Sequence, residues 1–271
     1  MNISSIMVSA ATLVTATLTL GSVAQAQVPP FKPVTEDVLR NPDPGDWLML
    51  NRTFDQQRFS PLKQINKSNV SKLRMAWSRG LPNGTQESVP IIYQGVMYLY
   101  APGASIQAVN ATNGDLIWEY FRDYPNTVNP QAARNKSLGI YEDMIYFAAP
   151  DGVLVAIDMK TGKERWATKV DDGGQTAGGI LVADGKVITN RTCIEGTRPQ
   201  CFIAAHDAKT GKEVWRFHTT AAAGEPGGDT WADMETNKRA ASPWGLPGSY
   251  DPKRKMLYWG IANPDPYTRL S

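Results

Sequence analysis

The sequence predicts an all-β propeller built from four-stranded blades. Three features predict it: a repeated segment, short apolar runs that alternate with polar turns, and the lack of helical periodicity. After residue 26, no segment keeps a 3.6-residue apolar period for more than about two turns. The 271 residues include 23 Gly and 19 Pro, a content typical of chains with many tight turns.

The repeated segment ends in a tryptophan. It follows the pattern A-x-[DN]-x-x-[TN]-G-x-x-x-W and occurs three times, as Ala108–Trp118, Ala156–Trp166 and Ala205–Trp215. Together with Trp77 and Trp259, these copies place a tryptophan about every 40–50 residues, a period typical of propellers and solenoids.

Strand-like runs decide between these two architectures. Each repeat has an alternating apolar run after a polar turn, then a shorter run, then the turn of the motif, then a strand that ends in the tryptophan. Four short strands per repeat indicate a propeller blade. The expected strands include Val96–Tyr100, Met144–Ala148, Leu154–Ile157, Lys186–Thr189 and Phe202–Ala205.

Each conserved position of the pattern has a physical role in this interpretation. We expect Gly162 and Gly211 to adopt positive φ in the turn, and the preceding Asp or Asn to accept hydrogen bonds from the turn backbone. We expect each tryptophan to pack between adjacent blades and not to take part in chemistry.

Residues 1–26 read as a secretory signal peptide. The stretch Ile6–Val23 has no charged residue and is followed by Ala24-Gln25-Ala26, which predicts cleavage after Ala26. A membrane anchor is the alternative, but the stretch is short and rich in Thr and Ser for a spanning helix. We therefore expect residues 27–271 to form an exported, periplasmic domain without a membrane span.

The composition excludes several classes of function. A net charge of +2 offers no strong field for nucleic acid, and two His with no matching nucleophile, His206 and His218, argue against hydrolase chemistry. No glycine-rich phosphate loop is present, so a nucleotide cofactor is not indicated. In an oxidising compartment Cys193 and Cys201 are expected to form a disulfide, with buried thiols or half of a metal site as alternatives.

The repeat resembles the tryptophan-docking motif of the pyrroloquinoline quinone (PQQ) dehydrogenases, and other stretches resemble the methanol and ethanol dehydrogenase branch of that family. Together they cover most of residues 46–267. These stretches are Asp46–Asn51, Arg58–Leu62, Gln64–Trp77, Gly224–Trp231 and Tyr250–Pro266.

The resemblance implies an eight-bladed propeller with PQQ on its axis, of which this chain holds about half the blades. It implies a dehydrogenase that oxidises a small alcohol to an aldehyde by hydride transfer to PQQ bound to calcium or a lanthanide, with cytochrome c as electron acceptor. The catalytic Asp of the family would lie beyond residue 271, so the chain looks truncated. Asp251, in a Tyr-Asp-Pro turn, is expected to be a blade turn and not a substitute base.

The same resemblance assigns candidate site residues. Asn263 matches the amide ligand of the cation, and Glu195 falls near its carboxylate ligand. Pro130-Gln131 occupies the positions of the family's vicinal cysteines, so that disulfide cannot form here. The candidate PQQ-binding residues are Glu87, Lys136, Thr176, Thr192, Ser242 and Trp244.

Two other functions remain open from the sequence. Non-catalytic propeller scaffolds share the repeat without the cofactor, and a truncated remnant would be inactive. The candidate PQQ-binding residues have no reason to accompany a bare scaffold, which favours the dehydrogenase interpretation.

Overall fold

The computed structural model describes residues 31–171, 179–192, 201–243 and 246–264. All of its helices and strands lie in the unit that spans residues 32–271. The predicted signal peptide lies outside the described residues. Among the residues described, no helix is long and apolar enough to cross a membrane.

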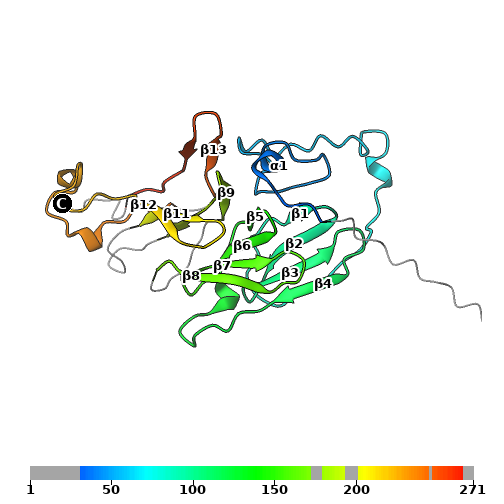
Figure 1. The fold of residues 1–271 in the computed structure, drawn as a ribbon, viewed down its shortest axis with the longest axis horizontal. Helices are drawn as coiled ribbons and strands as arrows, with labels where there is room; N and C mark the ends of the chain where they lie inside the picture. Colours follow the sequence, from blue (N-terminus) through cyan, green and yellow to red (C-terminus); the bar gives the residue numbers. More distant parts are fainter. Residues whose placement is uncertain (1–30, 172–178, 193–200, 244–245, 265–271) are drawn as a thin grey trace, which may run out of the picture. The chain divides into compact units, whose positions relative to one another are not determined.

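Three four-stranded antiparallel sheets make up most of the described chain and confirm the all-β prediction (Figure 1). In each sheet the strands pair in chain order, as expected for a blade. The first sheet contains β1 (Ile91–Tyr93), β2 (Val96–Ala101), β3 (Ser105–Asn110) and β4 (Leu116–Tyr120). The second contains β5 (Gly139–Tyr141), β6 (Met144–Ala148), β7 (Val153–Asp158) and β8 (Glu164–Lys169). The third contains β9 (Leu181–Ala183), β10 (Lys186–Arg191), β11 (Phe202–Asp207) and β12 (Glu213–His218).

The remaining elements are short. A two-stranded hairpin of β13 (Ser249–Asp251) and β14 (Met256–Tyr258) follows the third sheet. One helical turn, α1 (Glu36–Arg40), begins at Thr35, whose hydroxyl accepts a hydrogen bond from the Val38 N–H. Four single 3₁₀ turns complete the set: Val70–Lys72, Pro130–Ala132, Gly228–Trp231 and Thr236–Lys238.

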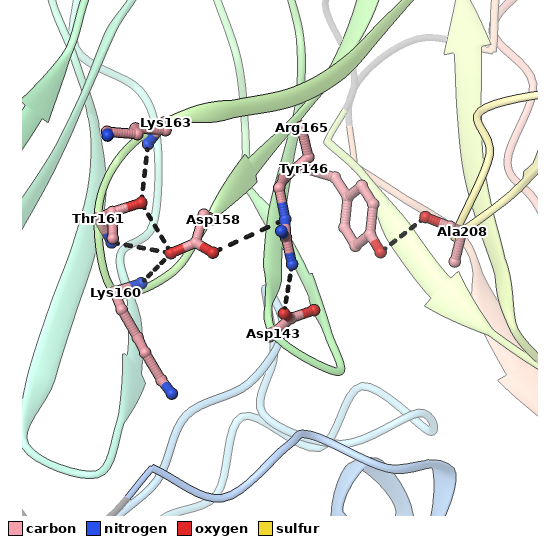
Figure 2. A network of polar contacts seen from close by, with 8 residues as sticks. All are labelled: Asp143, Tyr146, Asp158, Lys160, Thr161, Lys163, Arg165 and Ala208. Atoms are coloured by element: carbon pink, nitrogen blue, oxygen red, sulfur yellow. Dashed lines mark hydrogen bonds and ion pairs between the residues drawn. The ribbon is translucent and has the colours of Figure 1, made fainter.

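The turn of each repeat is closed by its Asp or Asn, as predicted. In the second repeat Asp158 Oδ1 accepts hydrogen bonds from the N–H of Lys160 at 3.0 Å and of Thr161 at 2.9 Å (Figure 2). Burial opposes ionisation of Asp158, but the hydrogen bonds from Thr161 and Lys160 outweigh it, and the pKa of Asp158 is lowered. Asp207 makes the same bonds in the third repeat, and Asp251 does so in the β13–β14 hairpin, which confirms it as a turn residue.

The repeats are joined by tryptophan packing. Trp118, at the end of the first sheet, lies against Gly162 in the turn of the second, and a Cβ added to Gly162 would lie 2.7 Å from its ring. The Trp118 Nε1–H donates to the Met159 carbonyl at 2.9 Å, in that same turn. Trp166 lies in the same way against Gly211 of the third sheet. Each tryptophan therefore needs a glycine in the following repeat, because any side chain there would occupy the place of the indole.

Trp77, at the start of the series, extends this pattern. Trp77 belongs to no strand among the described residues, yet its ring lies against Gly114 and its Nε1–H donates to the Ala111 carbonyl at 3.1 Å. Trp215, in the outermost strand of the third sheet, is 36% exposed, whereas Trp118 is 9% exposed. Trp259 differs, because it lies against Gly248, and these two residues flank the same hairpin.

His206 is the one buried histidine of the chain's two and is not part of the candidate site described below. It lies on β11, is 1% exposed, and has Glu213 Oε2 at 3.8 Å from its Nε2. Burial lowers its pKa below the usual 6.5, although Glu213 partly opposes this. His206 is therefore neutral in the folded protein, and its imidazole takes up a proton more readily in the unfolded protein. As the pH falls through about 6.5, this protonation favours the unfolded state.

We therefore expect the thermal midpoint to fall as the pH is lowered from 7.5 to 5.5, and the His206→Gln variant to show a smaller fall. His218→Gln is the matched control, because His218 is exposed on β12. Thermal unfolding followed by circular dichroism at several pH values measures both. An equal pH dependence in the His206→Gln variant and the wild type would contradict this role of His206.

Candidate functional site

A cavity of about 310 Å³ brings together residues from four distant parts of the chain. Its charged lining residues are Arg58, Glu87 and Lys136, and Trp47, Leu50, Asn51, Val89 and Leu246 complete the lining. Its volume lies at the lower end of the range of about 300–1,000 Å³ typical of sites for small ligands. It contains two of the residues that the sequence predicts to bind PQQ, so we take it as the candidate site.

Backbone pairing between the first two sheets brings Glu87 and Lys136 together. Val89 and Ser137 form a parallel bridge just before β1 and β5, and the Val89 N–H donates to the Lys136 carbonyl at 3.0 Å. As a result, Lys136 Nζ donates a hydrogen bond to Glu87 Oε2. The sequence places these two residues about 50 positions apart and gives no sign of this direct contact.

The ion pair with Lys136 keeps Glu87 in its ionised, carboxylate form. The hydrogen bond from Lys136 lowers the pKa of Glu87, and burial only partly opposes it. Arg134 adds a weaker attraction, with its Nε 3.7 Å from Glu87 Oε1. Glu87 is therefore a carboxylate at neutral pH, and the two cations and one anion of the lining leave the cavity with one net positive charge.

Asn135 fixes the backbone beside Lys136. Its side chain is 1% exposed, and its Oδ1 accepts a hydrogen bond from the Ser137 N–H at 3.0 Å, so the turn spans Lys136. The Nδ2 of Asn135 has no hydrogen-bond partner among the described residues. The sequence pairs Asn135 with Lys136 by resemblance, and the structure shows that Asn135 holds the chain in the conformation from which Lys136 reaches Glu87.

The segment of residues 47–58, which is mostly buried up to Phe54 and exposed at Arg58, contributes lining residues that the sequence did not single out as site residues. Trp47 pairs with Ile92 through two backbone hydrogen bonds, of 2.8 and 2.9 Å, which fasten this segment to β1. Asn51 and Arg58 then lie on the cavity wall. Both residues lie in stretches that resemble the family, Asp46–Asn51 and Arg58–Leu62, but the resemblance assigns neither of them a role in the site.

Three other predicted residues lie away from this lining. Ser242 is buried with its Oγ 3.9 Å from Cys201 Sγ, and its carbonyl accepts a hydrogen bond from the Ala262 N–H at 2.9 Å. Asn263, which is exposed, directly follows the hydrogen-bonded Ala262 in the chain. Thr192 directly follows β10 and is partly buried.

The remaining candidates, Thr176, Glu195 and Trp244, lie outside the described residues, as does Cys193. Cys201 is fully buried, and its disulfide with Cys193 stays a prediction. In the part of the chain that the structure describes, no three His, Cys, Asp or Glu side chains gather closely enough to hold a metal ion. The predicted cation site at Glu195 and Asn263 therefore stays a prediction as well.

A larger hollow, of about 740 Å³, lies between α1 and the β1–β2 turn. Asp46 lies in its wall, and its pKa is raised by burial and by the nearby Asp43 carboxylate, although the Gln94 N–H donates to it. None of the residues predicted to bind a cofactor lines this hollow, so it is not the candidate site.

The fold and the site define an all-β repeat protein with tryptophan-docked blades and a small cationic cavity at the start of its first two sheets. Comparison with known families agrees. The model of the PQQ family, described as the β-propeller domain of glucose, ethanol and alcohol dehydrogenases, matches residues 47–165 and 174–268. The chain belongs to this family, as its motifs indicate.

Curated relatives carry dehydrogenase names. The chain is 32% identical over 253 residues to the dehydrogenase subunit of the quinone alcohol dehydrogenase of Komagataeibacter europaeus, with 83% of this chain and 34% of the relative covered. It is 33% identical over 250 residues to the quinohemoprotein alcohol dehydrogenase ADH-IIG of Pseudomonas putida, with 82% and 33% covered. The chain thus spans about a third of the length of these relatives.

Solved structures show the same fold. A quinohemoprotein alcohol dehydrogenase from Pseudomonas putida HK5 superposes with a TM-score of 0.74 at 30% identity, covering 86% of this chain and 37% of that one. A europium-containing methanol dehydrogenase superposes with a TM-score of 0.72 at 28% identity, covering 84% and 44%. These matches confirm the propeller architecture.

Proposed function

We propose that this chain is part of a periplasmic quinoprotein dehydrogenase that oxidises a small alcohol to an aldehyde with PQQ as its cofactor. Cytochrome c is the proposed electron acceptor. The observation that carries the proposal is the cavity in which Glu87 and Lys136, assigned independently by resemblance, lie in direct contact. The dehydrogenase names of the curated relatives support the reaction class.

The lining of the cavity suits PQQ, a flat quinone with several carboxylates. Lys136 and Arg58 supply positive charge, Trp47 and Leu50 supply apolar surface, and the volume suits a small ring system. When bound, PQQ would supply the acceptor for the hydride that leaves the alcohol carbon. The role of this chain is to bind and orient the cofactor: Lys136 would hold an oxygen of PQQ, and Glu87 would hold the Lys136 ammonium in place.

We propose calcium or a lanthanide as the accompanying cation. The candidate ligands in this chain are Glu195 and Asn263, which offer the hard oxygen atoms that such ions prefer. We further propose that residues 1–26 direct export and that the disulfide joins Cys193 to Cys201. We assign no residue of this chain as the base that removes the proton of the alcohol.

The test is PQQ binding by the intact protein together with alcohol-dependent reduction of a dye. We expect the wild type, supplied with PQQ and calcium or lanthanum, to retain one PQQ per protein and to reduce the dye. The Trp244→Ala variant should lose most of the retained PQQ, because the resemblance matches Trp244 to the tryptophan on which the PQQ ring stacks. Absorbance after gel filtration measures the cofactor directly.

The matched control is Trp231→Ala. Trp231 lies with its ring 5.9 Å from the Arg239 guanidinium and does not line the cavity, so this variant should retain PQQ. A wild type that retains no PQQ under any of these conditions would overturn the proposed function and favour a non-catalytic propeller scaffold.

A further inference from the structure

We propose that Arg58 is the anion anchor of the cavity and binds a carboxylate of the ligand. The inference rests on the proposed function, since it takes PQQ as the ligand. It adds a binding residue that the sequence motifs do not assign. The evidence is a comparison of the ion pairs and hydrogen bonds made by the three charged residues that line the cavity.

Arg58 is the charged lining residue for which the described part of the chain supplies no counter-ion. Lys136 is paired with Glu87, and Glu87 is approached by Arg134 as well. Arg58, in contrast, makes no ion pair among the described residues, and its side-chain hydrogen bond goes to a neutral amide. The net positive charge of the cavity therefore belongs to the Arg58 guanidinium.

The guanidinium is held at one edge, which leaves the other edge open. Arg58 Nε donates to Asn51 Oδ1 at 2.7 Å. Asn51 Nδ2 donates in turn to Gln56 Oε1, and Gln56 Nε2 donates to the Gly248 carbonyl at 2.9 Å. This chain of neutral amides orients the guanidinium without neutralising it, so its terminal N–H groups remain able to bind a carboxylate with two parallel hydrogen bonds.

The backbone around Arg58 is held in an unusual conformation. Arg52, Gln56 and Arg58 have φ of 72°, 61° and 54°, in the left-handed region that non-glycine residues rarely adopt. The segment is nevertheless fixed, because the Arg58 N–H donates to the Asn51 carbonyl at 3.1 Å and the Tyr250 N–H donates to the Phe54 carbonyl at 3.1 Å. Strain that is held in place by the surrounding contacts is typical of binding sites.

This arrangement gives the two cations of the cavity different tasks. The charge of Lys136 is balanced by Glu87, so Lys136 mainly orients a ligand. The charge of Arg58 is not balanced among the described residues, so Arg58 mainly attracts an anionic ligand. A ligand with carboxylates, such as PQQ, is favoured over a neutral ring of the same size.

The test is equilibrium binding of PQQ to the intact protein freed of its cofactor, measured by ultrafiltration. We expect Arg58→Met to weaken PQQ binding about 10-fold or more, and Arg58→Lys to recover part of the loss. The wild-type affinity should also fall more steeply with added salt than that of Arg58→Met, since one charged contact has been removed. Arg74→Met is the matched control, because Arg74 is exposed, does not line the cavity and donates to the backbone carbonyl of Leu73.

A second variant tests the charge without removing the arginine. Asn51→Asp keeps the size of the side chain and gives Arg58 a counter-ion, although it removes the hydrogen bond from Asn51 Nδ2 to Gln56 Oε1. It should therefore weaken PQQ binding, and circular dichroism checks that the variant stays folded. Wild-type affinity in both Arg58→Met and Asn51→Asp, with PQQ still bound by the wild type, would overturn the role of Arg58 and leave the proposed function intact. A wild type that does not bind PQQ would overturn both.

Discussion

Replacement of Gly162 by alanine is expected to destabilise the protein by about 3 kcal/mol, which is large against the whole stability of a domain. Two causes add. Gly162 has φ of 71°, where a side chain costs about 1–2 kcal/mol. The new Cβ would also lie 2.7 Å from the Trp118 ring, so the indole must shift from its place between the two sheets, at a further cost of about 1–3 kcal/mol.

Gly185→Ala separates these two causes. Gly185 has φ of 67°, close to that of Gly162, but a Cβ there would meet no atom within 4 Å. This variant should therefore show the conformational cost alone, about 1–2 kcal/mol. Urea unfolding of the intact protein, followed by tryptophan fluorescence, measures both variants. Equal losses of stability in the two would mean that packing against Trp118 contributes little.

The Lys136→Met variant is expected to have the largest effect on cofactor binding, a loss of about 100-fold in PQQ affinity. The substitution removes a cation from the cavity and also leaves the Glu87 carboxylate without its principal partner. That carboxylate would then repel the anionic ligand, and the net charge of the lining would fall from positive to neutral. Equilibrium binding of PQQ measures the effect.

Lys136→Arg should keep most of the affinity, because it preserves the ion pair with Glu87. The double variant Lys136→Met, Glu87→Gln should bind PQQ more tightly than Lys136→Met alone, since it removes the unpaired carboxylate. Lys163→Met, in the exposed turn of the second repeat, controls for loss of a positive charge elsewhere. If the double variant binds no more tightly than the single one, Glu87 does not act through its pairing with Lys136.

The strands and turns could be predicted from the sequence because the repeat encodes them locally. Alternating apolar residues predicted β2, β6 and β10, and the Asp-x-x-Thr-Gly pattern predicted the turns that Asp158 and Asp207 close. The short helix α1 was missed, since one helical turn has too little periodicity to be detected. The packing of Trp259 also departs from the spacing, because its glycine flanks the same hairpin.

The candidate site was predicted less completely. Resemblance pointed to Glu87 and Lys136, but their direct contact depends on the parallel bridge between Val89 and Ser137, which no local pattern encodes. Arg58 and Asn51 were missed as site residues because their function arises from a neutral hydrogen-bonded chain and a non-glycine backbone of positive φ. Such features become visible only when distant segments are placed in space.

The contact between each tryptophan and the glycine of the next repeat has a consequence for how such proteins can be recombined. If a single repeat were cut out at the ends of its sheet, its tryptophan would be separated from the glycine of the next repeat, against which it packs. The tryptophan of the preceding repeat would likewise lose the glycine against which it packs. Exchange of blades between homologous proteins should therefore succeed when the crossover keeps each pair, such as Trp118 with Gly162, from one parent. The segment that must come from a single parent is then the junction between two blades, and not a whole blade.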